Sequence, residues 1–302
     1  MNSVQRPALS GLLLAAAGAI AFSGKAIIVK LSYRYGVDAV TVIMYRMLFA
    51  LPLFIAMGVW AERQASARAN PLTRRDVLDI IGLGFVGYYL SSYLDFLGLQ
   101  FVTASLERLI LYLNPTLVVL LGWAVYHKPI HPKRMWAMAV SYSGVLLVFS
   151  HELSFAGADV LLGSSLVFAS ALSYAVYLLY SGQLVQRIGA LRLVGWATSV
   201  ACVCCMVQFA VLRPLSAAVV PVEVLWLGVL NAVVCTVAPV LMVMMAIERI
   251  GAALTAQTGM MGPMATIALG VWVLNEPLNM WIGFGTLLVL GGVFIVSRYG
   301  SK

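Results

Sequence analysis

Five charged side chains lie inside long apolar stretches of this 302-residue sequence, and they are its strongest candidates for chemistry. They are Lys25, Arg46, Asp95, Glu107 and Arg108. A charge within an apolar segment is costly unless it faces a partner or a water-filled cavity. Arg108 or Lys25 could bind a carboxylate, and Glu107 could bind an ammonium group or exchange a proton. Charges of both signs together would suit a zwitterionic ligand.

The same residues also allow a structural interpretation, and both interpretations stay open at this point. Lys25, Asp95 and Glu107 fall near the ends of their apolar segments, where they could extend to solvent or form a structural ion pair. Arg46 falls deeper in its segment, so we expect it to be paired internally.

Polar and aromatic residues could line the walls of a binding cavity beside these charges. The candidates are Tyr88, Tyr93, Tyr177 and Gln257. Tyr88 shares one helical face with Asp95, because residues at i and i+7 lie above one another on a helix. The alternative interpretation is a belt of tyrosines at a membrane interface.

The composition predicts an all-α integral membrane protein. Hydrophobic residues make up 62% of the chain, charged residues 10%, and the mean hydropathy is +0.98. Many apolar runs approach or exceed the roughly 20 residues that a helix needs to cross a bilayer. The net charge of +8 is better explained by basic cytoplasmic loops than by nucleic-acid binding. Lipid and a small-molecule substrate are therefore the expected partners, and nucleic acid is not.

Ten apolar segments are expected to cross the membrane. They are residues 9–29, 39–60, 77–98, 104–126, 135–149, 160–180, 193–212, 224–247, 252–274 and 281–296. With the N-terminus inside, the inner segments hold thirteen Lys and Arg residues and the outer segments three. Because positive charge gathers on the cytoplasmic side, both termini are predicted to be cytoplasmic. We expect a multi-pass protein of the cell (inner) membrane.

The chain also contains an internal repeat at a shift of 148 positions. The matched pairs are Pro115 with Pro263, Gly122 with Gly270, and Pro129 with Pro277. This predicts two units of five spans, residues 1–150 and 151–302, and an odd number of spans makes the second unit inverted. Pro115 and Pro263 would fall in the middle of their spans, where each could kink its helix as a hinge. Thr255 and Ala256 stand opposite Glu107 and Arg108, so the predicted site is asymmetric.

Motifs of other protein classes are weak in this chain. The G-x-G-x-x-G of residues 82–87 lies within an apolar helical segment, so close helix packing explains it better than dinucleotide binding. The cysteines also lie in apolar runs with no nearby His, as packing residues do. We find neither H-E-x-x-H nor G-x-S-x-G, which disfavours an intramembrane enzyme. No cofactor or metal is expected.

The repeat and its motifs resemble the drug/metabolite transporter superfamily, EamA type. The residues that carry the resemblance are Pro263, Gly270, Leu274, Asn275, Glu276 and Pro277, with Arg46, Pro115, Gly122 and Gly144 in the first unit. Lys128 departs from the pattern, because it stands where Glu276 stands in the second unit. The resemblance covers essentially the whole chain and implies a carrier that moves metabolites across the membrane without ATP.

Together these observations predict a secondary transporter that works by alternating access and exports an amino acid or similar small amphipathic solute, with protons as the candidate coupling ion. An exporter of drug-like cations or nucleoside-type compounds is the alternative, and a purely structural or receptor protein is a third option. We expect a monomer or a weak homodimer.

Overall fold

The computed structural model describes residues 5–64, 67, 70–127, 130–156 and 158–298, and these residues form helices joined by short connections, with no strand among them. In the first half the elements are α1 (Gln5–Tyr33), α2 (Ala39–Glu62), α4 (Arg74–Leu83), the π-helical η1 (Gly84–Leu90), α5 (Ser91–Gly98), α6 (Ala104–Leu111), α7 (Asn114–Tyr126) and α8 (Pro132–Ala156). In the second half they are α9 (Ala158–Ile188), α10 (Ala190–Leu212), the short 3-10 helix η2 (Leu215–Ala218), α11 (Val222–Ala232), the π-helical η3 (Val233–Val237), α12 (Ala238–Gly259), α13 (Met261–Leu274) and α14 (Met280–Arg298).

Each of the ten expected segments falls on one helix or on a run of consecutive helices. Within the described part of the chain, seven such runs are long and apolar enough to cross a membrane, and α13 and α14 are shorter apolar helices. Large apolar side chains also cover the outside of the bundle, among them Trp226 at 70% exposure and Trp272 at 82%. Such a surface is unfavourable in water and is suited to lipid.

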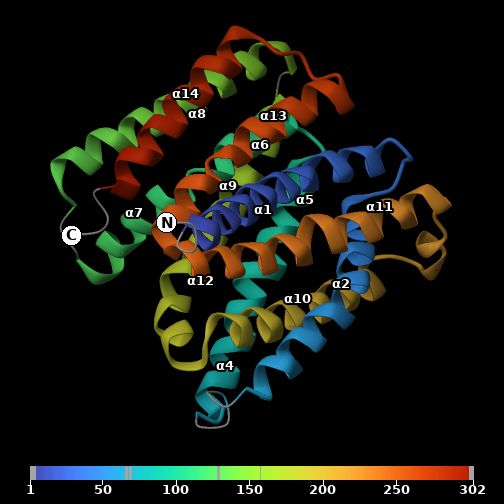
Figure 1. Cartoon of the computed structure of the whole chain (residues 1–302). Helices are drawn as coiled ribbons and strands as arrows, with labels where there is room; N and C mark the ends of the chain where they lie inside the picture. Colours follow the sequence, from blue (N-terminus) through green and yellow to red (C-terminus); the bar gives the residue numbers. More distant parts are fainter. Residues whose placement is uncertain (1–4, 65–66, 68–69, 128–129, 157, 299–302) are drawn as a thin grey trace.

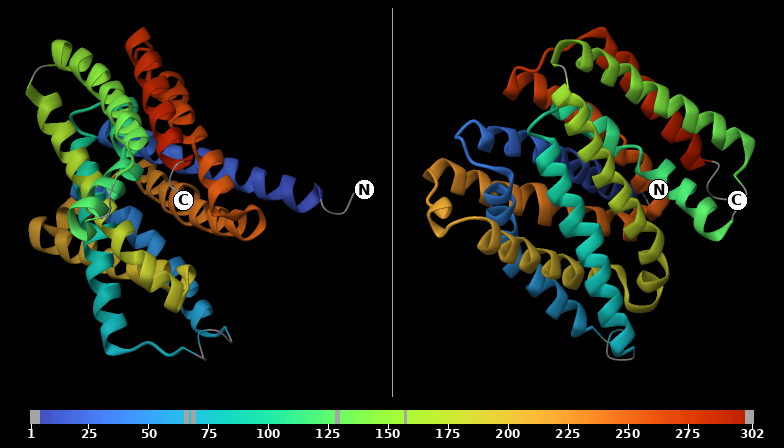
Figure 2. Two further views of the ribbon diagram at one scale, coloured as in Figure 1. Left: turned by 90° about the vertical axis from the view of Figure 1, so that its left-hand side faces the viewer. Right: turned by 180° about the vertical axis from the view of Figure 1, so that it is seen from behind.

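The helices pack as pairs from opposite halves of the chain (Figure 1). α8 lies beside α14 along one edge, α2 lies beside α10 on the other side, and α1 runs through the middle next to α12. Figure 2 shows the same arrangement from two further sides, with the N-terminal part of α1 extending beyond the other helices. Small residues permit the closest of these contacts. A Cβ on Gly144 would lie 2.6 Å from the carbonyl oxygen of Gly285, so these two positions of α8 and α14 tolerate no larger side chain.

Irregular backbone recurs at the repeat distance seen in the sequence. The π-helical turns η1 and η3 interrupt the third segment of each half. His127 and Asn275, which are 148 positions apart, are the non-glycine residues with positive φ in the described chain, at 52° and 58°. Both end the helix that precedes them.

The two hinge candidates lie in the first turns of helices, next to breaks in their segments. α6 ends at Leu111 and α7 starts at Asn114, so Pro115 occupies the first turn of α7. Pro263 likewise lies in the first turn of α13. A proline costs nothing there, because the first amide groups of a helix have no partner within the helix. Each segment is thus interrupted just before its proline, and a hinge at either position stays a prediction.

The glycine-rich motif of residues 82–87 lies across the junction of α4 and η1. A Cβ on Gly84 would collide with the backbone of Ala197 in α10, and one on Gly87 with the ring of Tyr177 in α9. Because these two glycines let three segments approach one another, the motif serves helix packing.

Candidate functional site

A buried ion cluster joins the three helices α1, α5 and α6. The Nζ atom of Lys25 in α1 lies 2.5 Å from Oδ2 of Asp95 in α5 and 3.4 Å from Oε1 of Glu107 in α6. Asp95 and Glu107 are 2% and 0% exposed, and Lys25 is 5% exposed. Lys25, Asp95 and Glu107 are called the ion cluster below. One ammonium group therefore serves two carboxylates.

The hydrogen bonds of the ion cluster are incomplete. Lys25 donates a hydrogen bond to Asp95, but it approaches Glu107 only as an ion pair. Both carboxylate oxygens of Glu107 and Oδ1 of Asp95 are buried without a hydrogen-bond partner. A buried carboxylate in this state is costly, and a proton or a ligand would relieve the cost.

Arg108 follows Glu107 in α6 but is bound differently. Its Nε donates to Oγ1 of Thr266 in α13 at 2.9 Å, and its Nη2 donates to the carbonyl oxygen of Phe22 at 3.2 Å. The guanidinium also lies over the Phe22 ring, 5.3 Å from its centre. Among the described residues Arg108 has no carboxylate within ion-pair distance. It joins α6 to α1 and α13.

Arg46 of α2 likewise lacks a carboxylate partner in the described part of the chain, and its internal partner is a hydroxyl group. Its Nε donates to Oγ1 of Thr236 in η3 at 3.0 Å, and the guanidinium lies 5.2 Å from the centre of the Phe96 ring. The side chain is buried, and Nη1 has no hydrogen-bond partner. Asp95 is paired with Lys25, so the contacts of Arg46 are with the Thr236 hydroxyl and the Phe96 ring.

The tyrosine candidates lie at the contact between η1, α5 and α9. The hydroxyl groups of Tyr88 and Tyr177 are 3.2 Å apart, and both rings pack against Tyr174. Tyr93 stacks on Tyr89 with 6.4 Å between ring centres. Tyr88 and Tyr177 therefore hold helices together across the two halves. The side chain of Gln257 lies outside the described part of the chain.

At the opposite side from the N-terminus, Glu276 closes a contact between the two halves. Its carboxylate accepts hydrogen bonds from the backbone amides of Ala104 and Ser105, at 2.7 and 3.3 Å, and from the Ser105 hydroxyl at 3.0 Å. Lys30 Nζ lies 3.7 Å from the same carboxylate. A carboxylate at the start of a helix is stabilised by the unpaired amide groups there. Glu276 with the first turn of α6 is called the Glu276 contact below.

Two cavities are lined by residues outside the ion cluster. One of about 450 Å³ adjoins the Glu276 contact and is lined by Lys30, Tyr33 and Arg34 among others. A larger apolar groove, of about 630 Å³, lies between the end of α1 and α11 and includes Trp226. Neither includes Lys25, Asp95 or Glu107. Burial and unmet hydrogen bonds, and not cavity size, therefore mark the candidate site.

Sequence reasoning missed several residues that complete these contacts. Thr236 and Thr266 each accept a hydrogen bond from an arginine of the first half, and Tyr174 completes the tyrosine cluster. A threonine in an apolar segment carries no distinctive signal, because its hydroxyl can bond to its own helix. Only the packing of the second half against the first identifies these partners.

The fold and its buried charges define a multi-pass helical membrane protein of the transporter class. The chain belongs to the EamA-like transporter family, whose model matches residues 9–150 and again residues 161–298. It is 29% identical to the "Uncharacterized transporter YcbK" of Bacillus subtilis (strain 168), over 96% of this chain and 92% of that protein. It is 21% identical to an "Uncharacterized transporter" of Archaeoglobus fulgidus, over 94% of this chain and 96% of that protein. A solved crystal structure that is 16% identical shares the fold, with a TM-score of 0.63 over 98% of this chain and 99% of that one.

Proposed function

We propose that this transporter exports an amino acid or a similar small amphipathic solute across the cytoplasmic membrane by alternating access, in exchange for protons. The observation that carries the proposal is the state of Glu107. Glu107 is 0% exposed, its Oε1 lies 3.4 Å from Nζ of Lys25, and neither carboxylate oxygen accepts a hydrogen bond. Such a group can take up either a proton or the ammonium group of a solute.

Competition at Glu107 would couple the two movements. A proton on Glu107 removes one negative charge from the ion cluster and weakens the binding of a cationic group there. A bound ammonium group would in turn lower the affinity of Glu107 for a proton, because linkage between the two sites is reciprocal. Proton entry and solute exit then exclude each other at one centre, which is the requirement for exchange.

The proposed architecture is ten transmembrane helices in two inverted units, residues 1–150 and 151–302, with both termini cytoplasmic. The family model matches the chain twice, at residues 9–150 and 161–298, which supports the division. The recurrence of π-helical turns and of the left-handed residues His127 and Asn275 also supports it. Inverted units provide two equivalent ways of opening a central site, one to each side of the membrane. In this arrangement the Glu276 contact closes the outer end.

Flux measurements in proteoliposomes test the proposal. A panel of labelled amino acids would be followed with and without an imposed proton gradient. We expect gradient-dependent flux in the wild type and flux without gradient dependence in Glu107→Gln, since glutamine keeps the shape but cannot titrate. Glu223→Gln is the matched control, because Glu223 is exposed in the first turn of α11.

Two results would contradict the proposal. Gradient dependence that persists in Glu107→Gln would exclude this carboxylate as the coupling group. Absence of flux for every amino acid, in a protein with a normal thermal unfolding transition, would exclude the proposed substrate class and favour drug-like or nucleoside-type compounds.

A further inference from the structure

We propose, on the basis of the transport function above, that Arg46 binds a carboxylate of the transported solute. The solute would then carry an anionic group. Arg46 would make the protein bind a carboxylic acid more tightly than the amide of the same acid. Three observations support the proposal: the charges buried in the first half, the Nη1 donor of Arg46 that has no partner, and the apolar surroundings of the guanidinium.

The balance of charge around the centre favours an anion. Five charged side chains are buried inside the apolar segments of the first half, namely Lys25, Arg46, Asp95, Glu107 and Arg108. Asp76 is also buried, but it lies in the first turn of α4 and is paired with Arg187. Of the five, three are cations and two are carboxylates, and both carboxylates are close to Lys25. Neither arginine has a carboxylate within ion-pair distance among the described residues, and a solute carboxylate would supply one. A purely cationic solute would increase the imbalance.

The donors of Arg46 are arranged to receive such a group. Thr236 occupies Nε at 3.0 Å, and Nη1 is buried with no hydrogen-bond partner. A guanidinium presents its donors as a planar fork that matches the two oxygens of a carboxylate. Arg108 differs, because its Nη2 already donates to Phe22 at 3.2 Å. Of the two arginines, only Arg46 has a buried nitrogen, Nη1, without a hydrogen-bond acceptor in the described part of the chain.

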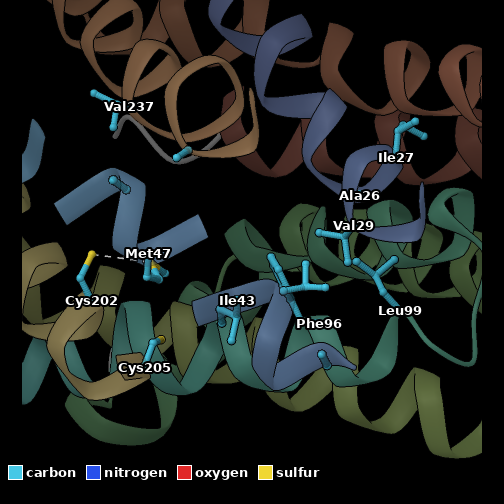
Figure 3. Close-up of a cluster of buried hydrophobic side chains, with 14 of the residues drawn as sticks. Ala26, Ile27, Val29, Ile43, Met47, Phe96, Leu99, Cys202, Cys205 and Val237 are labelled. Carbon is cyan, nitrogen blue, oxygen red and sulfur yellow. Dashed lines mark hydrogen bonds between the residues drawn. The ribbon is translucent and has the colours of Figure 1, made fainter. Parts of the chain in front are cut away.

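The surroundings of Arg46 keep water away from the fork. Phe96 lies under the guanidinium, and the neighbouring positions of α2 are Tyr45 and Met47. Ile43, Met47, Phe96, Cys202 and Cys205 belong to one buried apolar cluster (Figure 3). A charged hydrogen bond is stronger in such surroundings than in water, whereas an unfilled donor is costly. Arg46 should therefore discriminate sharply between a carboxylate and a neutral amide.

The segment that bonds to Arg46, α11 with η3, also has polar atoms without hydrogen-bond partners. The Thr236 hydroxyl donates to the carbonyl oxygen of Asn231 at 2.8 Å, five residues earlier, across the π-helical turn η3. Both polar atoms of the Asn231 side chain are buried without a partner. Arg46 and Asn231 thus both have unmet hydrogen-bonding groups, and the Thr236 hydroxyl bonds to Arg46 and to the backbone of Asn231.

Thermal unfolding of the purified full-length protein in detergent tests the proposal without requiring transport. The probes are matched pairs of acid and amide: acetate and acetamide, benzoate and benzamide, L-leucine and L-leucinamide, L-phenylalanine and L-phenylalaninamide. We expect at least one acid to raise the unfolding midpoint while its amide at equal concentration does not. In Arg46→Gln the half-maximal concentration should rise about 10- to 100-fold, as expected for the loss of a charge-assisted hydrogen-bonded pair.

Two further variants separate binding from folding. Arg46→Lys keeps the charge but not the fork, and Thr236→Val keeps Arg46 but removes the partner of Nε, so both should weaken the preference for acids. Arg213→Gln is the control, because Arg213 is an exposed arginine paired with Asp38 outside the site. If Arg46→Gln fails to fold, the lysine and valine variants carry the test.

The outcomes of the binding and flux assays are distinct. Equal effects of acids and amides on the wild type, or no effect of any probe, would overturn the assignment of Arg46 whatever the flux assay shows. An acid preference that survives in Arg46→Lys and Thr236→Val would also overturn it. Acid-dependent stabilisation in a protein that moves no amino acid of the panel would keep the carboxylate site and exclude the proposed amino-acid transport.

Discussion

The carboxylate of Glu276 accepts a hydrogen bond of 2.7 Å from the backbone amide of Ala104, although the two residues are 172 positions apart. The contact joins the connection after α13 to the first turn of α6, and it lies at the end of α1 where Lys30 is found. At the equivalent position of the first half the sequence has Lys128 in place of a carboxylate. A lysine cannot accept a hydrogen bond from a helix start, so this position of the first half cannot form the same contact.

Glu276→Gln should loosen the Glu276 contact. The amide keeps the shape but loses the negative charge that favours the start of a helix, at a cost of about 1 kcal/mol. Hydrogen exchange of the peptide that contains residues 104–111 is the measurement, and we expect faster exchange in the variant. Glu223→Gln is the control in the first turn of another helix. Unchanged exchange in this peptide would show that the contact does not hold the start of α6.

Lys25→Met should be strongly destabilising. It leaves the carboxylates of Asp95 and Glu107 buried without a cation, and breaking a buried pair in this way costs about 3–5 kcal/mol. Unfolding in detergent should therefore occur at a much lower temperature. The double variant Lys25→Met with Asp95→Asn should recover part of the loss, because one of the two uncompensated charges is gone. Losses that simply add in the double variant would argue against a coupled ion cluster.

Gly84→Ala should destabilise the protein by about 1–3 kcal/mol, because the added Cβ would collide with the backbone of Ala197. Gly82→Ala is the matched control in the same motif, since a Cβ there meets no atom within 4 Å. Thermal unfolding of the two variants side by side gives the difference. Equal stability of both would mean that the motif does not serve the packing of η1 against α10.

Asp38 gives a pH-dependent prediction outside the membrane-spanning segments. Partial burial raises the pKa of Asp38, but hydrogen bonds from Thr41 and Arg213 more than offset this and hold the pKa below its usual value. A lowered pKa in the folded protein contributes stability above the unfolded pKa, and that stability is lost as the pH falls through the folded value. Asp38 also caps α2 by accepting a hydrogen bond from the amide of Val40 at 2.9 Å.

Asp38→Ala should therefore cost about 1 kcal/mol at pH 7 and progressively less toward pH 3. Asp38→Asn should cost less at pH 7, because asparagine also caps helices and loses only the exposed pair with Arg213. Unfolding midpoints between pH 3 and pH 7 are the measurement. A difference between wild type and Asp38→Ala that grows on acidification would have the wrong sign for this account.

The sequence by itself determined the helical segments and the presence of a costly charged centre. Hydropathy is a local property, so an apolar run such as residues 39–60 can be recognised as a helix without knowledge of the fold. The helix α2 extends beyond this run by only two residues. Local pattern did not reveal that the segments around Pro115 and Pro263 are each two helices, because a proline is compatible with a kink and with a helix start. The glycines of residues 82–87 were read as packing residues for a local reason too, since they lie in an apolar segment.

Only the tertiary structure decided which charges meet. From the sequence, Lys25, Asp95 and Glu107 could form a structural ion pair or open onto a binding cavity, and Arg46 was expected to be paired internally. In the structure Lys25 takes both carboxylates, and each arginine bonds through Nε to a threonine of the second half, 190 and 158 positions away. Pairing depends on how far each helix is rotated about its axis and on which helix packs beside it. Those quantities are set by contacts across the whole bundle, and no single segment contains them.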